Sequence, residues 1–370
     1  GRIAPTSAWQ LTLLRLLSPV RNAYGDDFTV ESVLVRLGSG DLEGWGDSSS
    51  LKYPTYSPEC AVTQFIICRD FIAPLLLGED ICSGDELQNR LSAIKGNYFA
   101  KGGFDMAWWD LHARMLGKPL WQVLGGASPT VEAGADFGVM EHIDRLLEAI
   151  AAALQQGYKR VKLKYRPGWD LEMVSTVRKA FPDAVFHIDC NSAYTLDDLE
   201  MFQALDHYNL AMIEQPLRHD DLLDHAALQA RIRTPICLDE SITSVHKARQ
   251  AIQIQACRWV NIKPARVGGI TNALAIHNLC AEAGISCWIG GMLESAVGAS
   301  HCLALATLPN IQYPCDIFPS TRFFAQDLGE PPLAHSAPGQ FRARDEPGIG
   351  CAPNPDLLER YTVERAVFGM

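Results

Sequence analysis

The stretch KRVKLKY (159–165) is the first of five short runs that read as β-strands and end in a charged residue. The other four runs are AVFHIDC (184–190), LAMIEQP (210–216), TPICLDE (234–240) and RWVNIKP (258–264). The charged residues follow at intervals of 25, 25, 25 and 24 positions and are Lys164, Asp189, Glu214, Asp239 and Lys263. One strand of ~5 residues, one helix of ~12 and two short loops together occupy about this length. The spacing therefore predicts repeated strand–helix units with one charge at the end of each strand.

Three more β-rich runs extend the alternation to eight strands. They are VEAGADF (131–137), ISCWIGG (285–291) and IQYPCDI (311–317). The stretches between strands have helical length, and Thr195 and Asp198 stand at capping-box spacing before one apolar face. Eight strands alternating with helices predict an α/β fold, a modified TIM-type (β/α) barrel over residues 129–318. The alternative is a doubly wound open sheet, but that fold usually has fewer strands, and no G-x-G-x-x-G follows the first strand.

The chain before GGASPT (125–130) shows a different order of predicted elements, with strands first and helices after them. Residues 28–38 and 42–46 read as strands of a small antiparallel sheet. Helical stretches follow near 58–75, 85–98 and 102–116. Strands followed by helices predict a separate α+β module over residues 1–128.

Composition narrows the classes of partner. The net charge of −11 argues against nucleic acid, which requires a basic surface. The sequence has no uninterrupted run of ~20 apolar residues, the length needed to span a membrane. The N-terminal stretch lacks the features of a signal peptide. The eleven cysteines are scattered singly without a C-x-x-C pair, so we expect reduced, buried thiols in a cytoplasmic protein. We also expect a homo-oligomer.

The alternation of side chains along a strand sorts the barrel residues into two faces. Residues two apart share a face, so Lys162 points the same way as Lys164, and Asn191 follows Asp189. The opposite faces carry apolar residues suited to covering helices, namely Val161, Leu163, Ile188, Ile213, Leu238 and Ile262. The charges are therefore predicted to gather at the C-terminal mouth of the barrel, where such enzymes keep their chemistry.

Three of the strand-end residues are carboxylates on adjacent strands. Asp189, Glu214 and Asp239 form a hard oxygen site suited to Mg²⁺ or Mn²⁺. Zinc is disfavoured because no His or Cys cluster accompanies them. The alternative is a set of salt-bridged structural acids, but three acids in one register, flanked by lysines, favour a site. His187 shares a face with Asp189 one pleat deeper, and we interpret it as a core histidine.

The lysines indicate proton transfer. Like-charge repulsion from Lys162 and a nearby metal would lower the pKa of Lys164 and make it a competent base. The α-proton of a carboxylate is very weakly acidic, so its removal gives an enediolate that a Lewis-acid metal would stabilise. Lys164 and Lys263 lie on opposite strands of the predicted barrel. This arrangement suits racemisation of a small carboxylate, or an elimination or cycloisomerisation in which one lysine acts only through its charge.

These motifs resemble the enolase superfamily over nearly the whole chain. The segments that carry the resemblance are VKLKY (161–165), HIDCN (187–191), IEQP (213–216), CLDES (237–241) and NIKPARVGG (261–269). The resemblance implies Lys164 as base, with Lys162 assisting at the substrate carboxylate and Lys263 as opposing base. It also implies Asp189, Glu214 and Asp239 as metal ligands.

Further positions follow from the same resemblance. Glu240 would be the partner of Lys263. Asn191 and Arg266 would contact the metal ligands and lysines and hold them in place. The barrel would carry an N-terminal capping domain, and the C-terminal segment 319–370 would return to complete it.

The subgroup is narrowed by two segments. Lys263 stands where mandelate-racemase-like members have a His–Asp dyad, which favours the muconate-cycloisomerase-like subgroup. Dipeptide epimerases carry a D-x-D element near residue 290, whereas IGGMLES (289–295) is closer to o-succinylbenzoate synthases and N-succinylamino-acid racemases. Arg266 and DIFPSTRFFAQDL (316–328) also resemble that group. A muconate-type cycloisomerase, a dipeptide epimerase and a non-catalytic metal-binding relative remain alternatives, although the intact lysines and acids argue against the last.

Substrate contacts are expected at several positions. Gly291, Met292 and Glu294 belong to the loop after the seventh strand. Asp136 ends the first strand where those relatives tend to carry a small hydroxyl residue, and its carboxylate would repel an anionic succinyl group. Cap loops 18–26 and 50–59 are expected to close over the substrate. Their candidate contacts are Arg21, Tyr24, Tyr53 and Tyr56, for which exposed loop positions are the alternative.

Overall fold

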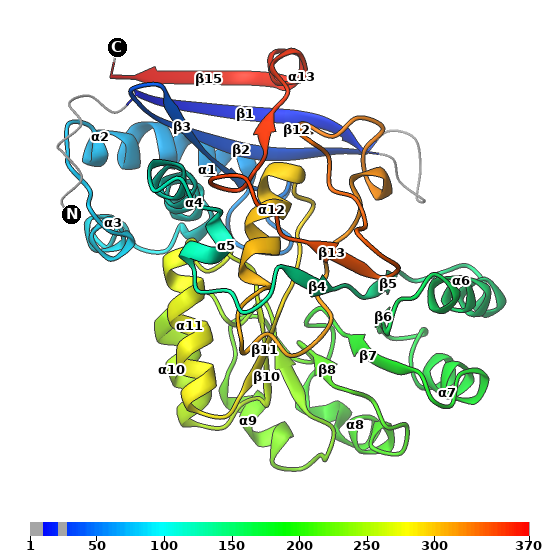
Figure 1. The fold of residues 1–370 in the computed structure, drawn as a ribbon. Helices are drawn as coiled ribbons and strands as arrows, with labels where there is room; N and C mark the ends of the chain where they lie inside the picture. Colours follow the sequence, from blue (N-terminus) through cyan, green and yellow to red (C-terminus); the bar gives the residue numbers. More distant parts are fainter. Residues whose placement is uncertain (1–9, 21–27, 370) are drawn as a thin grey trace.

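The computed structural model describes residues 10–20 and 28–369, and Figure 1 shows a capping sheet above a barrel. The capping sheet has the strand order β15-β1-β2-β3. Its strands are antiparallel and comprise β1 (Gln10–Val20), β2 (Phe28–Ser39), β3 (Leu42–Ser48) and β15 (Thr362–Phe368). The C-terminal strand therefore completes the N-terminal sheet, as the resemblance implied.

Strands β2 and β3 confirm the two predicted strands, whereas β1 was not predicted. Its sequence QLTLLRLLSPV has apolar residues in near-continuous succession. Both of its faces are covered: Leu13 belongs to the core under the cap helices, and Leu14 belongs to the core shared with the barrel. A strand buried on both faces loses the period-two alternation by which strands are recognised.

The cap helices cover one face of this sheet (Figure 1). They are α1 (Ala61–Ile67), the π-helix η1 (Cys68–Ile72), α2 (Ala73–Leu76), α3 (Gly84–Leu91) and α4 (Tyr98–Met115), and the short helix α5 (Leu120–Val123) follows and packs against α4 and α12 (Ala296–Leu305). The first three form the helical run expected near 58–75. The helix expected over 85–98 ends at Leu91, because the chain then turns through Gly96 and Asn97, which have φ values of 58° and 52°.

The barrel is built on a parallel sheet in the order β11-β10-β9-β8-β7-β6-β5. Its strands are β5 (Ala135–Phe137), β6 (Arg160–Lys164), β7 (Val185–Asp189), β8 (Ile213–Glu214), β9 (Ile236–Leu238), β10 (Trp259–Ile262) and β11 (Ser286–Ile289). The α/β barrel predicted from the sequence is thus confirmed. Just before β5, β4 (Thr130–Glu132) pairs antiparallel with β13 (Gln340–Arg342) instead.

The eighth predicted strand, 311–317, forms isolated parallel bridges rather than a regular strand. Ile311 bridges Cys287 on one side, and Cys315 bridges Ala133 on the other. The amide of Gln312 donates to Cys287 O at 2.9 Å, and the amide of Gly134 donates to Cys315 O at 3.0 Å. Pro314 lies within this segment and has no N–H to give to a ladder. These bridges connect the two edges of the curled sheet.

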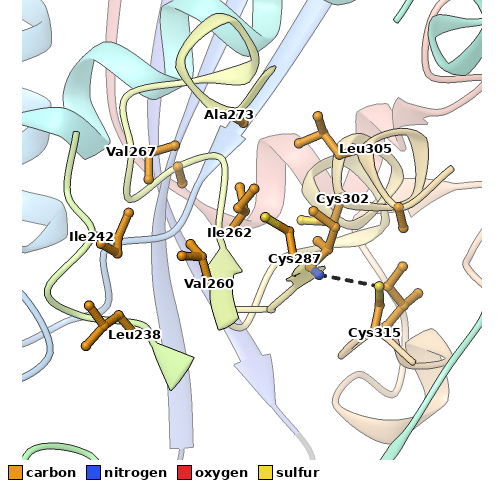
Figure 2. Close-up of a cluster of buried hydrophobic side chains, with 14 of the residues drawn as sticks. Leu238, Ile242, Val260, Ile262, Val267, Ala273, Cys287, Cys302, Leu305 and Cys315 are labelled. Carbon is orange, nitrogen blue, oxygen red and sulfur yellow. Dashed lines mark hydrogen bonds between the residues drawn. The ribbon is translucent and has the colours of Figure 1, made fainter. Parts of the chain in front are cut away.

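Helices surround the barrel strands, and the predicted outward residues are buried against them. The helices are α6 (Ile143–Gln155), α7 (Leu171–Ala180), η2 (Leu196–Asp198), α8 (Leu199–Leu205), α9 (Leu223–Gln229), α10 (Val245–Gln253), α11 (Ile270–Glu282) and α12 (Ala296–Leu305). All six predicted outward residues are at most 1% exposed. Figure 2 shows part of this layer, in which Val260 and Ile262 lie near Ala273 of α11.

The remaining elements belong to the C-terminal segment of the chain. They are η3 (Ser320–Arg322), β12 (Gly329–Glu330), β14 (Ala352–Pro353) and α13 (Pro355–Tyr361). All eleven cysteines are free, and most are buried, as expected of reduced thiols. Among the helices of the described residues, none combines the length and apolarity needed to cross a membrane.

Candidate active site

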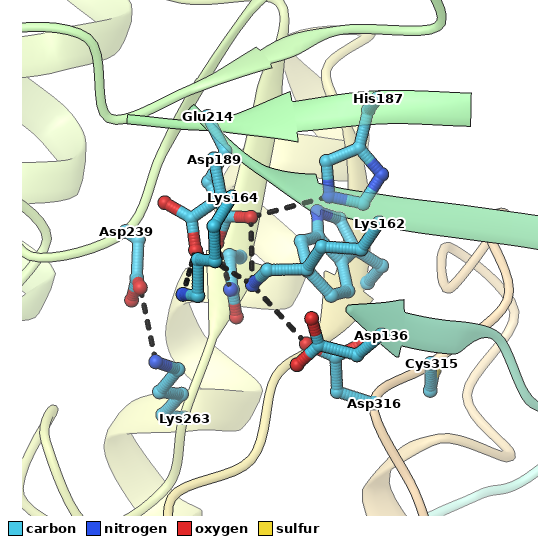
Figure 3. A network of polar contacts seen from close by, with 12 residues as sticks. Asp136, Lys162, Lys164, His187, Asp189, Glu214, Asp239, Lys263, Cys315 and Asp316 are labelled. Atoms are coloured by element: carbon cyan, nitrogen blue, oxygen red, sulfur yellow. Dashed lines mark hydrogen bonds and ion pairs between the residues drawn. The ribbon is translucent and has the colours of Figure 1, made fainter. Parts of the chain in front are cut away.

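The strand-end charges meet at the barrel mouth, as Figure 3 shows. Adjacent strands place them in one register, since Lys164 pairs with Asp189 and Asp189 pairs with Glu214 as Cα partners. Lys164 Nζ donates to Asp189 Oδ2 at 2.7 Å and to Asn191 Oδ1 at 2.8 Å. Lys263 Nζ donates to Asp239 Oδ2 at 2.9 Å. The 25-residue spacing thus brings together all five residues that it singled out.

Lys162 lies deeper and joins the carboxylates to one another. Its Nζ lies 2.9 Å from Asp189 Oδ2 and 2.9 Å from Glu214 Oε2. The side chain is only 4% exposed, and both carboxylates are at most 1% exposed. An ammonium buried this far requires such partners, since an uncompensated buried charge is costly.

The pKa shifts show which charges dominate. Burial opposes ionisation of Asp189, but Lys162 and Lys164 outweigh it and hold its pKa below the usual range. Burial has the largest effect on Lys164 and lowers its pKa, but the charge and hydrogen bond of Asp189 together with the charge of Asp136 more than offset burial and Lys162, so the pKa is raised. The sequence-based expectation of a lowered pKa for Lys164 is therefore not met in this arrangement. Lys162 does act in the predicted direction, but Asp189 has the larger effect.

Lys162 also contacts an ion pair, formed by Asp316 and Arg160, that the sequence analysis did not single out. Asp316 Oδ2 lies 3.3 Å from Lys162 Nζ, and Asp316 Oδ1 accepts from Arg160 Nη2 at 2.8 Å. Arg160 is fully buried on β6, and its Nε also donates to Pro314 O at 3.1 Å. Two signals were available: Arg160 shares a face with Lys162, and Asp316 lies near the end of the eighth predicted strand, as the strand-end charges of the other strands do.

His187 is buried as predicted, and it also contacts a site carboxylate. Its Nε2 lies 3.2 Å from Glu214 Oε2, and its Nδ1 lies 3.0 Å from the Tyr313 hydroxyl. Burial lowers the pKa of His187, which favours the neutral ring. Asn261 Nδ2 donates to the other oxygen, Glu214 Oε1, at 2.7 Å. Glu214 is therefore fixed from the barrel interior.

The cap reaches the site through Tyr56. Its hydroxyl donates to Asp239 Oδ1 at 2.8 Å and accepts from Lys263 Nζ at 3.2 Å and from Arg266 Nη1 at 3.1 Å. Arg266 also bonds Asp239 directly through Nη1. Tyr56, a candidate substrate contact, thus lies at the cluster, and Arg266, a candidate supporting residue, lies beside Asp239.

Glu240 and Asn191 contact each other, with Asn191 Nδ2 donating to Glu240 Oε1 at 3.2 Å. Burial, and after it the charges of Asp239 and Asp189, raise the pKa of Glu240 to about 8. Its Oε2 is buried without a partner among the described residues. Glu240 was expected to pair with Lys263, but in this structure Lys263 bonds Asp239 instead.

The substrate contacts expected in the loop after β11 and at the end of β5 lie near Asp316 and Lys162. Met292 and Glu294 line a small cavity with Asp316, and the Met292 amide donates to Glu294 Oε1 at 2.8 Å; Gly291, beside them, lies close to the carbonyl of Asp316. Asp136 pairs with Lys162 in register, and its Oδ1 is buried without a partner among the described residues.

The tyrosine and arginine candidates of the cap loops differ in position. The Tyr53 side chain is 63% exposed beside Lys52, so the structure does not bring it to the cluster. Arg21 and Tyr24 lie outside the described residues.

The donor set fits a hard divalent cation in its chemistry. Asp189, Glu214 and Asp239 supply carboxylate oxygens from the ends of consecutive strands, and Glu240 beside them has a buried oxygen without a hydrogen-bond partner among the described residues. In the arrangement seen here the lysines hold these oxygens. Across residues 10–20 and 28–369, no three His, Cys, Asp or Glu side chains are grouped closely enough to hold a metal ion.

The capped barrel and the cluster of lysines and carboxylates at its mouth indicate an enzyme built on an α/β barrel. Two family models match the chain: Enolase C-terminal domain-like over residues 145–357, and Mandelate racemase / muconate lactonizing enzyme, N-terminal domain, over residues 10–125. The chain belongs to the enolase superfamily, in the mandelate racemase / muconate lactonizing enzyme family.

Individual relatives agree with this assignment. An o-succinylbenzoate synthase from Geobacillus kaustophilus is 43% identical over 357 residues, covering 96% of this chain and 95% of the relative. An N-succinylamino acid racemase from Thermus thermophilus is 41% identical over 360 residues, covering 96% of this chain and 97% of the relative. A solved enolase-superfamily structure from Listeria innocua is similar with a TM-score of 0.93 at 35% identity, covering 98% of this chain and 99% of that one.

Proposed function

We propose that this enzyme removes the α-proton of a small carboxylate and acts as an o-succinylbenzoate synthase, an N-succinylamino-acid racemase, or both. The observation that carries the proposal is a pair of lysines: Lys164, which ends β6, and Lys263, which directly follows β10. These strands stand four places apart in a ring of seven strands and one bridging segment, so they lie across the barrel from each other. Each lysine is held by a different buried carboxylate, Asp189 or Asp239.

The chemistry assigns a role to each group. Lys164 accepts the α-proton as the C–H bond breaks, and the electron pair moves into the substrate carboxylate to give an enediolate. A Mg²⁺ or Mn²⁺ ion held by Asp189, Glu214 and Asp239 would supply Lewis-acid stabilisation of that charge. Lys162 adds a fixed positive charge at the substrate carboxylate. Its charge also favours the neutral form of Lys164 when Lys164 is released from Asp189.

Lys263 has one of two roles, which separate the two activities. In racemisation it returns a proton to the opposite face of the enediolate. In dehydration Lys263 stabilises the enediolate through its charge. Lys164 returns the abstracted proton to the hydroxyl group, and water leaves as the electron pair of the enediolate forms the new carbon–carbon double bond. The Geobacillus and Thermus relatives carry one name each at nearly equal identity, so both activities enter the proposal.

The test follows both reactions in the same preparation. The protein is incubated with Mg²⁺ and N-succinyl amino acids in D₂O, and exchange of the α-proton is followed by NMR for each enantiomer. Dehydration to o-succinylbenzoate is assayed separately. Exchange of both enantiomers without dehydration supports the racemase and excludes the synthase, and the converse result excludes the racemase. Absence of both reactions contradicts the proposal and favours a muconate-type cycloisomerase or a dipeptide epimerase.

A further inference from the structure

A cavity lies at the junction of the cap and the barrel, and we call it the junction cavity. Its volume is about 390 Å³, and its walls come from α3 and α4 of the cap and from α11 of the barrel (Figure 1). The described residues that line it include none of the lysines and carboxylates of the barrel mouth. Sites for small molecules typically have about 300–1,000 Å³ and often lie between domains, so this cavity is large enough for a ligand.

The cap and the barrel are fixed to each other beside the cavity, at Gly84 and Thr271. A Cβ atom at Gly84 would clash with Thr271 Oγ1, so a glycine is needed for α3 to approach α11 this closely. The same hydroxyl accepts a hydrogen bond from Trp109 Nε1 at 2.9 Å and donates one to Asp105 Oδ2 at 2.7 Å. Because these contacts join all three helices, the cavity is a preformed part of the fold.

Three aromatic rings of α4 form one wall of the junction cavity. The rings of Trp108 and His112 are stacked with their centroids 4.7 Å apart, and Trp109 meets both of them edge-on. The two indole N–H groups already donate, one to Ile81 O and the other to Thr271 Oγ1. The tryptophans therefore offer a ligand only aromatic surface, which attracts flat rings and cations.

The charge of the cavity lining is negative. Of the described residues that line it, Asp85 is the only one with a carboxylate, and none is a lysine or an arginine. The Asp85 side chain is exposed and has no hydrogen-bond partner among the described residues. Burial lowers the pKa of His112, which keeps its ring neutral near pH 7. The lining therefore favours a cation over an anion.

We propose that the junction cavity binds a small, flat aryl cation, a molecule that joins an aromatic ring to an amidinium, guanidinium or ammonium group. The ring packs between the aromatic wall of α4 and the side chains of Leu274 and Ala275 on α11, and the cation faces Asp85. Planar cations with two N–H donors match the two oxygens of a carboxylate. The bound molecule contacts both domains and holds the cap against the barrel. This site is independent of the reaction proposed for the barrel mouth.

The first experiment titrates the full chain with three matched compounds by isothermal titration calorimetry, in buffer containing Mg²⁺. Benzamidine is the flat aryl cation, benzamide lacks its charge, and cyclohexanecarboxamidine lacks its flat ring. We expect benzamidine to bind with a Kd on the order of 1 mM, and each of the other two compounds to bind about 10-fold more weakly. Absence of benzamidine binding, or equal binding of all three compounds, overturns the proposal.

The second experiment locates the bound benzamidine with variants of the full chain. Ala275→Phe fills the cavity from α11 and should abolish binding, and Asp85→Asn removes the negative charge and should weaken binding about 5-fold. The controls are Ala281→Phe and Asp80→Asn, because both residues are exposed nearby but do not line the cavity. Both controls should bind benzamidine as the wild type does. Unchanged binding in both cavity variants contradicts the proposal.

Circular dichroism shows whether each variant is folded, and the exposed Asp85→Asn tests the site even if the larger side chain at Ala275 disturbs α11. A third measurement compares backbone hydrogen exchange with and without saturating benzamidine. We expect slower exchange both in the cap helices that line the cavity and in α11, because the bound molecule contacts both walls. Slower exchange only around the carboxylates of the barrel mouth would place benzamidine in the active site, and the proposal would be wrong.

Discussion

The two proposed catalytic lysines occupy different surroundings at the same barrel mouth. Lys164 keeps 34% of its side chain exposed and bonds two residues from the end of β7, Asp189 and Asn191. Lys263 keeps only 7% exposed and is enclosed by Asp239 and the cap residue Tyr56. One lysine therefore faces the open mouth, whereas the other is held beneath the cap. The proposed function gives the first lysine the proton transfer in every reaction and the second the role of either a base or a fixed charge.

The largest effect is expected from Lys164→Ala, which removes the open-side base. General acid–base catalysis contributes about 10²–10⁴-fold, so we expect kcat to fall by about 10³–10⁴ for exchange and for dehydration alike. The α-proton exchange and dehydration assays measure both losses. Lys179→Ala is the matched control, because Lys179 is exposed on α7 away from the mouth. Full activity of Lys164→Ala on either substrate would show that the assigned base is wrong.

A smaller and more selective effect is expected from Lys263→Ala, which removes the enclosed lysine. Exchange of one enantiomer should fall about 10³-fold, since its proton faces Lys263, while exchange of the other enantiomer is largely retained. Lys263→Arg keeps the charge without a usable base, because guanidinium does not lose its proton. If Lys263 acts through charge in dehydration, arginine recovers that activity but not the exchange. Equal loss of both activities in both variants contradicts the distinction between the two lysines.

Part of this comparison was predictable from the sequence. The strand-end spacing fixed five charged residues on five strands, and side-chain alternation identified Lys162 as their neighbour. Both inferences rest on local periodicity, which a single chain displays directly. The barrel and the apolar outer face followed from the same periodicity.

Contacts between distant segments were not predictable in this way. The pairing of Asp316 with Arg160 and Lys162 joins residues more than 150 positions apart and depends on how the barrel closes. Tyr53 and Tyr56 are equivalent candidates in the loop sequence, yet only Tyr56 reaches Asp239. The backbone path of that loop decides which tyrosine points inward. Sequence periodicity does not contain this information.

A buried contact between the cap and the barrel predicts that the free energy of unfolding depends on pH. Asp47 of β3 accepts from Ser295 N and Oγ at 3.0 and 2.6 Å, just before α12. Burial raises the pKa of Asp47 from its ordinary value of 3.8 to about 7. Between these values the folded state holds a proton that the unfolded state lacks, so stability falls as pH rises from about 4 to 7. The contribution lost is about 2–4 kcal/mol.

Denaturant unfolding at pH 5 and pH 8 measures this effect. Asp47→Asn has no proton to lose, so its stability should change less between the two pH values than that of the wild type. Asp41→Asn is the control, because Asp41 is exposed in the turn between β2 and β3. The same pH dependence in the wild type and in Asp47→Asn would show that this carboxyl is not the titrating group.

The smallest effect is expected from Tyr56→Phe, and it tests whether the cap makes the two lysines different. The substitution removes the hydroxyl that bonds Asp239, Lys263 and Arg266 but keeps the ring. Because Lys263 and Arg266 remain paired with Asp239, we expect a loss of about 10-fold, equivalent to ~1.4 kcal/mol.

The loss should fall on the exchange that uses Lys263 and spare the exchange that uses Lys164, since Lys164 has no bond to Tyr56 among the described contacts. Exchange of each enantiomer in D₂O measures the ratio of the two rates. Tyr53→Phe provides the control, because that exposed ring belongs to the same loop but does not reach the site. An equal loss for both enantiomers would mean that Tyr56 supports the site as a whole. The enclosure of Lys263 would then have no bearing on its role.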